Sequence, residues 1–197
     1  MRKVIVTNIM TLDGFNSGPG GDPMVLNMDA AFDAYNLECM RSAGTILLGR
    51  RSFEGFSSFW PAVADAPDDP ANPALSVTNR EFSRLYRDIP KLVVSDTLDV
   101  ATDNAWHDST EVVSRATAAE RIAAERAGGG GIVIYGSHLL WTALLAAGLI
   151  DELHLIVGPA AIGNGVPMFS QPTTLTLLGT RTFDGSSNVL LRYAPAA

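Results

Sequence analysis

Short apolar runs and longer amphipathic runs follow one another along most of the chain. The short runs are rich in β-branched residues and predict strands at 3–10, 45–49, 91–95, 111–113, 132–135 and 151–157. The longer runs predict helices at 29–42, from 50 to just before Trp60-Pro61, and at 78–89, 117–127 and 137–147, with Asp29 as the N-cap of the first. Residues 62–73 are rich in Pro, Asp and Ala, which predicts a surface loop and the best candidate for a mobile segment.

The C-terminal part of the chain has a different pattern. Segments 175–183 and 189–193 flank a turn of Asp, Gly, Ser and Asn residues, which predicts an antiparallel hairpin. Strands that alternate with helices favour parallel pairing. The whole pattern therefore predicts an α/β fold with a mixed, mostly parallel sheet, helices on both faces and an antiparallel edge. At 197 residues, we expect one domain, 1–197.

The composition excludes several classes of protein. Hydrophobic residues make up 47% and the formal net charge is −7, which indicates a globular core and argues against a nucleic-acid partner. No apolar run approaches the roughly 20 residues of a membrane span, and no signal-peptide core follows the N-terminus. The single cysteine, Cys39, excludes an intrachain disulfide and a multi-cysteine metal site. We expect a cytoplasmic protein without a metal or a membrane partner.

Two junctions share one design, in which an apolar strand leads through glycine into a helix. These are 47–52, with Gly49, Arg50 and Ser52, and 134–137, with Gly136 and Ser137. In a parallel sheet both would open at the carboxyl edge, where the amides of a helix N-terminus favour phosphate. The alternative is that they are ordinary turns, since such junctions commonly use glycine and serine. The glycines at 128–131 precede a strand, so they cannot form a Rossmann loop.

Other polar residues suggest chemistry less specifically. Asp13, in Asp13-Gly14 after the first strand, is either a substrate-facing carboxylate or a turn aspartate. His138 is expected to pack beside Trp141 or Thr142, and His154 to be a structural strand residue. The Asp151-Glu152 pair begins a strand, away from the carboxyl edge, and is interpreted as structural or interfacial.

Six blocks in a fixed order carry a family resemblance. They are Thr11-Leu12-Asp13-Gly14, Leu48 to Glu54, Lys91 to Ser95, Tyr135-Gly136-Ser137, Gly148 to Leu153, and the stretch from Pro159 through Gly163 and Gly165 to Phe169. In order and spacing they resemble the dihydrofolate reductase-like family, and more specifically the reductase domain of the bacterial riboflavin-biosynthesis deaminase-reductase and its stand-alone relatives. The resemblance implies a dihydrofolate reductase-like mixed sheet, a reduced nicotinamide cofactor, usually NADPH, and a homodimer.

The resemblance also implies roles for individual residues. The residues expected to bind the cofactor are Gly49, Arg50, Arg51, Ser52, Ser95, Gly136, Ser137, His138 and Leu139. The residues expected to border the substrate are Asp13, Gly14, Pro159 and Gly163, and Asp13 is the expected catalytic residue, acting directly or through water. The homodimer expectation also uses the apolar Leu153, Leu155 and Val157.

The chain departs from the family pattern at three points. Asp96 stands where relatives often carry Arg or Lys, so NADH is not excluded as the cofactor. Thr7 stands where riboflavin-pathway reductases typically carry lysine, which argues against a phosphoribosyl-aminopyrimidine substrate, and no deaminase half is present. We expect an NAD(P)H-dependent reductase of a C=N or C=O bond in a small substrate, for example a pterin- or aminopyrimidine-like heterocycle; the alternative is a non-catalytic ligand-binding or nucleotide-binding protein on the same fold.

Overall fold

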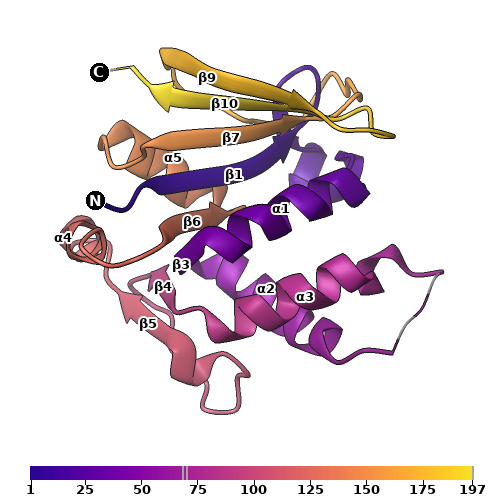
Figure 1. Cartoon of the computed structure of the whole chain (residues 1–197). Coiled ribbons are helices and arrows are strands. Elements are labelled where there is room, and N and C mark those ends of the chain that lie inside the picture. Colours follow the sequence, from indigo (N-terminus) through magenta and orange to yellow (C-terminus); the bar gives the residue numbers. More distant parts are fainter. Residues whose placement is uncertain (68, 70, 197) are drawn as a thin grey trace.

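One eight-stranded sheet organises the computed structural model, which describes residues 1–67, 69 and 71–196. The order across the sheet is β5-β4-β3-β6-β1-β7-β10-β9 (Figure 1). The strands are β1 (Val4–Met10), β3 (Ala43–Gly49), β4 (Lys91–Val94), β5 (Thr110–Val113), β6 (Gly131–Tyr135), β7 (Glu152–Val157), β9 (Leu175–Thr182) and β10 (Val189–Pro195). A small sheet pairs β2 (Phe15–Ser17) with β8 (Val166–Pro167).

The strand directions confirm the predicted mixed sheet. Neighbours from β5 to β7 are parallel, whereas β10 runs antiparallel to both β7 and β9. The strands β9 and β10 form the predicted C-terminal hairpin. The carboxyl ends of β1, β3, β4, β5 and β6 therefore meet along one edge, where their loops can build a site.

Helices cover both faces of the sheet, as predicted (Figure 1). On one face α1 (Ala30–Ser42), α2 (Arg50–Ala64) and α3 (Val77–Asp88) bury aromatic side chains, including Phe53, Phe82 and Tyr86. On the other face α4 (Ala118–Glu125) and α5 (His138–Ala146) bury Ile122 and Trp141. Three-residue 3₁₀ helices occupy Pro19–Gly21, Pro23–Val25, Pro73–Leu75 and His107–Ser109. Among the described residues no helix is long and apolar enough to cross a membrane.

Helix α1 starts where the sequence predicts, after Asp29. The Asp29 carboxylate accepts hydrogen bonds from the amides of Ala31 and Phe32, both at 3.0 Å, and so caps α1. Ser76 caps α3 by accepting from the amide of Asn79 at 3.1 Å. These caps satisfy amides that have no partner within the helix.

The predicted end of α2 before Trp60-Pro61 is wrong, because the helix continues to Ala64 with Pro61 inside it. Tertiary contacts explain the difference. The indole of Trp60 packs on Phe82 with ring centroids 4.7 Å apart, and the Trp60 carbonyl accepts from the Ser83 hydroxyl of α3. Part of the predicted loop at 62–73 is therefore helical. Residues 68 and 70, which belong to the same prediction, lie outside the described residues.

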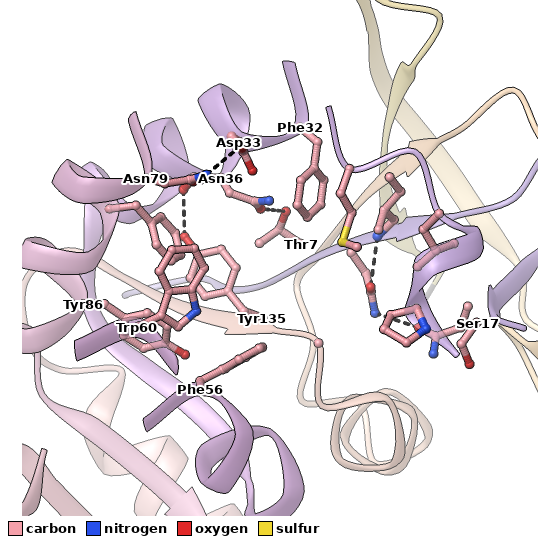
Figure 2. Close-up of a pocket in the computed structure, with 18 of the residues that line it drawn as sticks. Thr7, Ser17, Phe32, Asp33, Asn36, Phe56, Trp60, Asn79, Tyr86 and Tyr135 are labelled. Atoms are coloured by element: carbon pink, nitrogen blue, oxygen red, sulfur yellow. Dashed lines mark hydrogen bonds between the residues drawn. The ribbon is translucent and has the colours of Figure 1, made fainter. Parts of the chain in front are cut away.

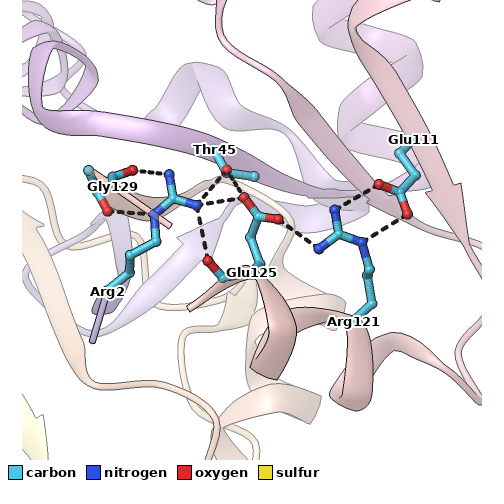
Figure 3. Close-up of polar contacts among 7 residues, drawn as sticks. Arg2, Thr45, Glu111, Arg121, Glu125 and Gly129 are labelled. Atoms are coloured by element: carbon cyan, nitrogen blue, oxygen red, sulfur yellow. Dashed lines mark hydrogen bonds and ion pairs between the residues drawn. The ribbon is translucent and has the colours of Figure 1, made fainter. Parts of the chain in front are cut away.

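Ion pairs join the chain at the sheet edge opposite the carboxyl ends (Figure 3). The carboxylate of Glu125 binds the guanidinium groups of Arg2 at 2.6 Å and Arg121 at 2.7 Å, and Arg121 also pairs with Glu111 at 2.8 Å. Burial raises the pKa of Glu125, but hydrogen bonds from Thr45 and the two arginines outweigh it, so this pKa lies below its usual value. The network links the N-terminus, β3, α4 and β5.

Two expectations about β7 have different outcomes. Leu153 and Leu155 are 0% and 2% exposed within the core, so they offer no surface for a dimer, and the homodimer stays a prediction. His154 is structural, as expected: one ring nitrogen lies 2.8 Å from the Tyr35 hydroxyl and the other 2.8 Å from the Glu152 carboxylate.

Candidate functional site

The structure brings the two predicted glycine turns together at the carboxyl edge. They follow the neighbouring strands β3 and β6, and two hydrogen bonds join them. The Gly49 amide donates to the Ser137 hydroxyl at 3.1 Å, and the Ser137 amide donates to the Ser52 hydroxyl at 2.9 Å. Neither hydroxyl donates to another described residue, so both hydrogens remain free for a ligand.

The Gly136-Ser137 turn has an unusual backbone. Ser137 has a φ of 49° and is the only non-glycine residue with positive φ among those described. This conformation costs about 1–2 kcal/mol and persists where surrounding contacts enforce it, often at functional sites. Gly136 has a φ of 55°, which favours glycine, and a Cβ there would be in ordinary contact with the Phe56 ring at 3.4 Å.

The two helices that begin at these turns have free N-termini. Neither α2, with Gly49 at its N-cap, nor α5, with Ser137, has a side-chain cap, in contrast to α1 and α3. Their first-turn amides, including those of Arg51 and His138, are therefore available to an anion. Two adjacent N-termini with free serine hydroxyls match the donors that a diphosphate group needs.

The side chains of the other predicted cofactor residues lie around these turns. Arg50 is exposed and donates to Glu54 at 2.7 Å and to the Thr97 hydroxyl at 2.8 Å. The exposed Arg51 makes no hydrogen bond or ion pair with another described residue. The Ser95 hydroxyl accepts the amides of residues 97 and 98 and so shapes the turn after β4.

The two predicted cofactor residues at the start of α5 differ in environment. One His138 ring nitrogen lies 2.9 Å from the Met168 carbonyl, and the ring packs edge-on against Trp141, as expected. Leu139 is 74% exposed. Their cofactor roles stay predictions.

The four predicted substrate residues lie together, but none lines the cavity described below. The Asp13 carboxylate accepts from the Thr11 hydroxyl and from the amides of Ile162 and Gly163, at 2.6, 2.9 and 2.7 Å. These bonds, first the one from Thr11, hold the pKa of Asp13 below its usual value. Asp13 thus anchors the loop that contains Gly163, and its catalytic role stays a prediction.

Sequence reasoning missed a cavity of about 310 Å³ beside the turns (Figure 2). It lies between β1, β6, helices α1 to α3 and the segment after β2. Its walls include the aromatic side chains of Phe32, Phe56, Trp60, Phe82, Tyr86 and Tyr135. Gly136 lines the cavity as well as forming the second turn, so the cavity and the free helix N-termini adjoin. The signal in the sequence was polar Asp33 and Asn36, three residues apart on the inner side of an otherwise packed helix.

Polar groups enter the cavity from several elements, among them β1, α1 and α3. The amide of Asn79 donates to the Asp33 carboxylate at 2.9 Å, and the Thr7 hydroxyl donates to the Asn36 side-chain oxygen at 3.0 Å (Figure 2). The Asn36 side-chain nitrogen donates to no other described residue. The Tyr86 hydroxyl is buried without a hydrogen-bond partner among those residues. These groups offer a ligand both donors and acceptors.

Asp33 is the single charged side chain among the described residues that line the cavity. Burial raises its pKa to about 6, the hydrogen bond from Asn79 opposes this rise, and the negative charge of Asp29 adds to it. An acid with this pKa exchanges a proton near neutral pH and lies in a cleft, which is typical of functional carboxyl groups.

The sheet order and the carboxyl-edge site define a class, the dihydrofolate reductase-like α/β fold. Dihydrofolate reductase from Enterococcus faecalis, complexed with NADP(H) and RAB-propyl, superposes with a TM-score of 0.60 over 99% of this chain and 97% of that one, at 13% identity. A putative riboflavin biosynthesis protein from Shewanella sp. PV-4 gives 0.68 over 99% of both chains, at 20% identity. At these identities the likeness shows the fold.

Sequence comparison then shows the family. Residues 2–189 match the RibD C-terminal domain, and the chain belongs to this reductase-like family. The uncharacterized protein YyaP of Bacillus subtilis (strain 168) is 28% identical over 187 residues, which span 92% of this chain and 89% of YyaP.

Proposed function

We propose that this protein is an NAD(P)H-dependent reductase of a C=N or C=O bond in a small, flat heterocycle. The support is that Gly136 leads into the uncapped N-terminus of α5, beside that of α2, and also lines a cavity with one carboxylic acid among its described residues. A nicotinamide dinucleotide whose diphosphate is held at the turns would place its nicotinamide at that wall. Membership of the RibD C-terminal domain family supports the same reaction class.

Each part of the site has a chemical task in this proposal. A bound reduced nicotinamide supplies the hydride. The first-turn amides of α2 and α5, with Ser52 and Ser137, bind the diphosphate. Asp33 gives a proton to the nitrogen or oxygen of the reduced bond and regains it from solvent, because its pKa of about 6 keeps a useful fraction protonated near neutral pH.

The cavity also restricts the substrate. Aromatic walls suit a flat ring, and Asp33 and Asn36 can bind its polar edge. The described lining includes no Lys or Arg, and Thr7 stands in the cavity wall. A phosphate inside would face the charge of Asp33 without a counterion, which is strongly unfavourable. Any phosphate on the substrate therefore lies outside the cavity, so aminopyrimidines and pterins without phosphate are the first compounds to test.

The direct test measures NADPH and NADH binding by calorimetry, and then oxidation of the reduced cofactor at 340 nm with these compounds. Arg50→Ala should weaken nucleotide binding about tenfold, because it removes a charge-assisted contact near the diphosphate. The matched control is Arg84→Ala, which removes an exposed arginine from α3. Equal binding by both variants and the unaltered protein would contradict the assigned phosphate site.

Trp60 provides a separate measure of substrate binding. It lines the cavity, whereas the other two tryptophans, Trp106 and Trp141, are fully buried. A ring in the cavity should quench the Trp60 emission, and Trp60→Phe should remove this response. Quenching by a heterocycle without binding of either nucleotide would favour the alternative, a non-catalytic ligand-binding protein on this fold. Nucleotide binding with turnover would exclude it.

A further inference from the structure

The acid in the cavity has a partner on a neighbouring helix. Asp33 belongs to α1 and Asn79 to α3, and both side chains line the cavity (Figure 2). The Asn79 side-chain nitrogen donates to Asp33 Oδ2 at 2.9 Å, whereas no described residue donates to Oδ1. The two oxygens of this carboxyl group are therefore not equivalent, because one is bound by the protein and the other is left for a ligand.

Asn79 is itself held in place at the start of α3. It is buried, its backbone amide donates to the Ser76 hydroxyl at 3.1 Å, and its side-chain nitrogen also donates to the Pro73 carbonyl at 3.3 Å. A side chain held by packing and by a second hydrogen bond keeps its direction. Asn79 can therefore fix the direction of the carboxyl group that it binds.

This hydrogen bond also decides which oxygen carries the proton when Asp33 is neutral. The carbonyl oxygen of a carboxylic acid accepts a hydrogen bond better than its hydroxyl oxygen does, so the oxygen bound by Asn79 is the carbonyl oxygen. The proton of the neutral acid therefore lies on Oδ1. When this proton leaves, the hydrogen bond from Asn79 to Oδ2 strengthens, because the acceptor becomes charged.

We propose that Asn79 is a positioning residue, which directs Asp33 so that Oδ1 carries the exchangeable proton and presents it to the ligand. In the reduction, the Oδ1–H bond breaks, an N–H or O–H bond forms on the substrate, and solvent returns a proton to Oδ1. This proton complements the hydride of the proposed reaction. The inference rests on the proposed function for the reaction, but the state of the Asp33 carboxyl group can be measured without turnover.

The charges around Asp33 suit this role. Burial raises the pKa of Asp33, the hydrogen bond from Asn79 opposes the rise, and the carboxylate of Asp29, one turn earlier on α1, adds to it. The partner that α3 presents is a neutral amide, and the described lining of the cavity contributes no Lys or Arg. A cation in place of Asn79 would keep Asp33 ionised, whereas a neutral donor orients the carboxyl group and leaves it able to exchange a proton.

The alternative is that Asn79 only ties α3 to the 3₁₀ helix before it, through the Pro73 carbonyl. Ser76 provides a matched control for this structural role. Ser76→Ala removes the cap of α3 at the same place and leaves the side chain of Asn79 unchanged. A purely structural role predicts that substitutions at both positions lower stability and that neither changes the acid strength of Asp33.

The test follows the titration of the Asp33 side-chain carboxyl carbon by ¹³C NMR, with Asp33→Asn to assign the signal. Asn79→Leu keeps the volume and removes the donor, so Asp33 should become an acid about tenfold weaker. Asn79→Asp places a second carboxyl group within hydrogen-bond distance, so the pair should retain one proton to higher pH than Asp33 does alone. Ser76→Ala should leave the titration unchanged.

The outcomes separate this inference from the proposed function. A titration of Asp33 that neither Asn79 variant changes, or that Ser76→Ala changes as much, would overturn the role of Asn79 and leave the reductase proposal intact. Once a substrate is turned over, Asn79→Leu should also move the alkaline limb of the kcat profile upward by about one pH unit and lower kcat more than it changes KM. A shifted titration in a protein that binds neither nucleotide would support the positioning of Asp33 and contradict the reductase.

Discussion

Replacing Asp33 by asparagine should make the protein more stable and less active. The carboxyl group is buried against the apolar cavity wall, which favours its neutral form and raises its pKa from 3.8 to about 6. Above pH 7 the folded protein must hold a charge there that the unfolded chain holds more easily. A rise of about two pKa units, at about 1.36 kcal/mol each, makes this penalty roughly 3 kcal/mol.

The sign follows from proton linkage. Between pH 4 and 6 the folded protein binds the Asp33 proton and the unfolded chain releases it, so stability falls as pH rises through this window. Asp33→Asn keeps an oxygen that accepts from Asn79 and removes the charge. The variant should match the unaltered protein near pH 4 and exceed it by up to about 3 kcal/mol at pH 8, or several degrees in Tm. Turnover should fall about 10² to 10⁴-fold because the proton donor is lost.

Urea denaturation at pH 4, 6 and 8 measures the stability difference, with Asp99→Asn as a control at an exposed aspartate. A gain in stability at pH 8 that vanishes at pH 4, together with lost turnover, would show that this acid is kept for function at a cost in stability. A variant that is less stable at pH 8, or a difference independent of pH, would refute the reasoning about burial.

Two other predictions concern anchoring contacts. Asp13→Ala should speed hydrogen exchange at the amides of Ile162 and Gly163, measured by mass spectrometry, because their acceptor is lost; β1 should be unaffected, and unchanged exchange in the loop would contradict the anchor. Glu125→Gln should lower the free energy of unfolding at pH 7 by about 1–3 kcal/mol, because two arginines lose a partly buried partner. Since the folded pKa of Glu125 is lowered, this loss should shrink as pH falls below about 4.5, and a loss that persists in acid would argue against the charge as its cause.

Local physics explains which elements could be predicted. The β-branched runs, the cap at Asp29 and the terminal hairpin depend on neighbours in the chain, and each forms as expected. The end of α2 did not follow its local signal: Pro61 tends to end a helix, but here the helix continues and Trp60 contacts Phe82 and Ser83 of α3. The two glycine turns were found because a strand, a glycine and a helix start are contiguous.

The sequence by itself determined the class of fold, the two turns and, through the order of its blocks, the family. Those features are contiguous or follow from the order of elements, so they can be recognised without knowing distances. Tertiary structure alone decided the cavity with Asp33, the placement of Asp13 on a loop, and the pairing of Asp96 with Arg115. In each case the partners lie far apart in the chain or on different elements. Their contacts depend on how strands and helices pack, and burial, which sets the pKa of Asp33, exists only after packing.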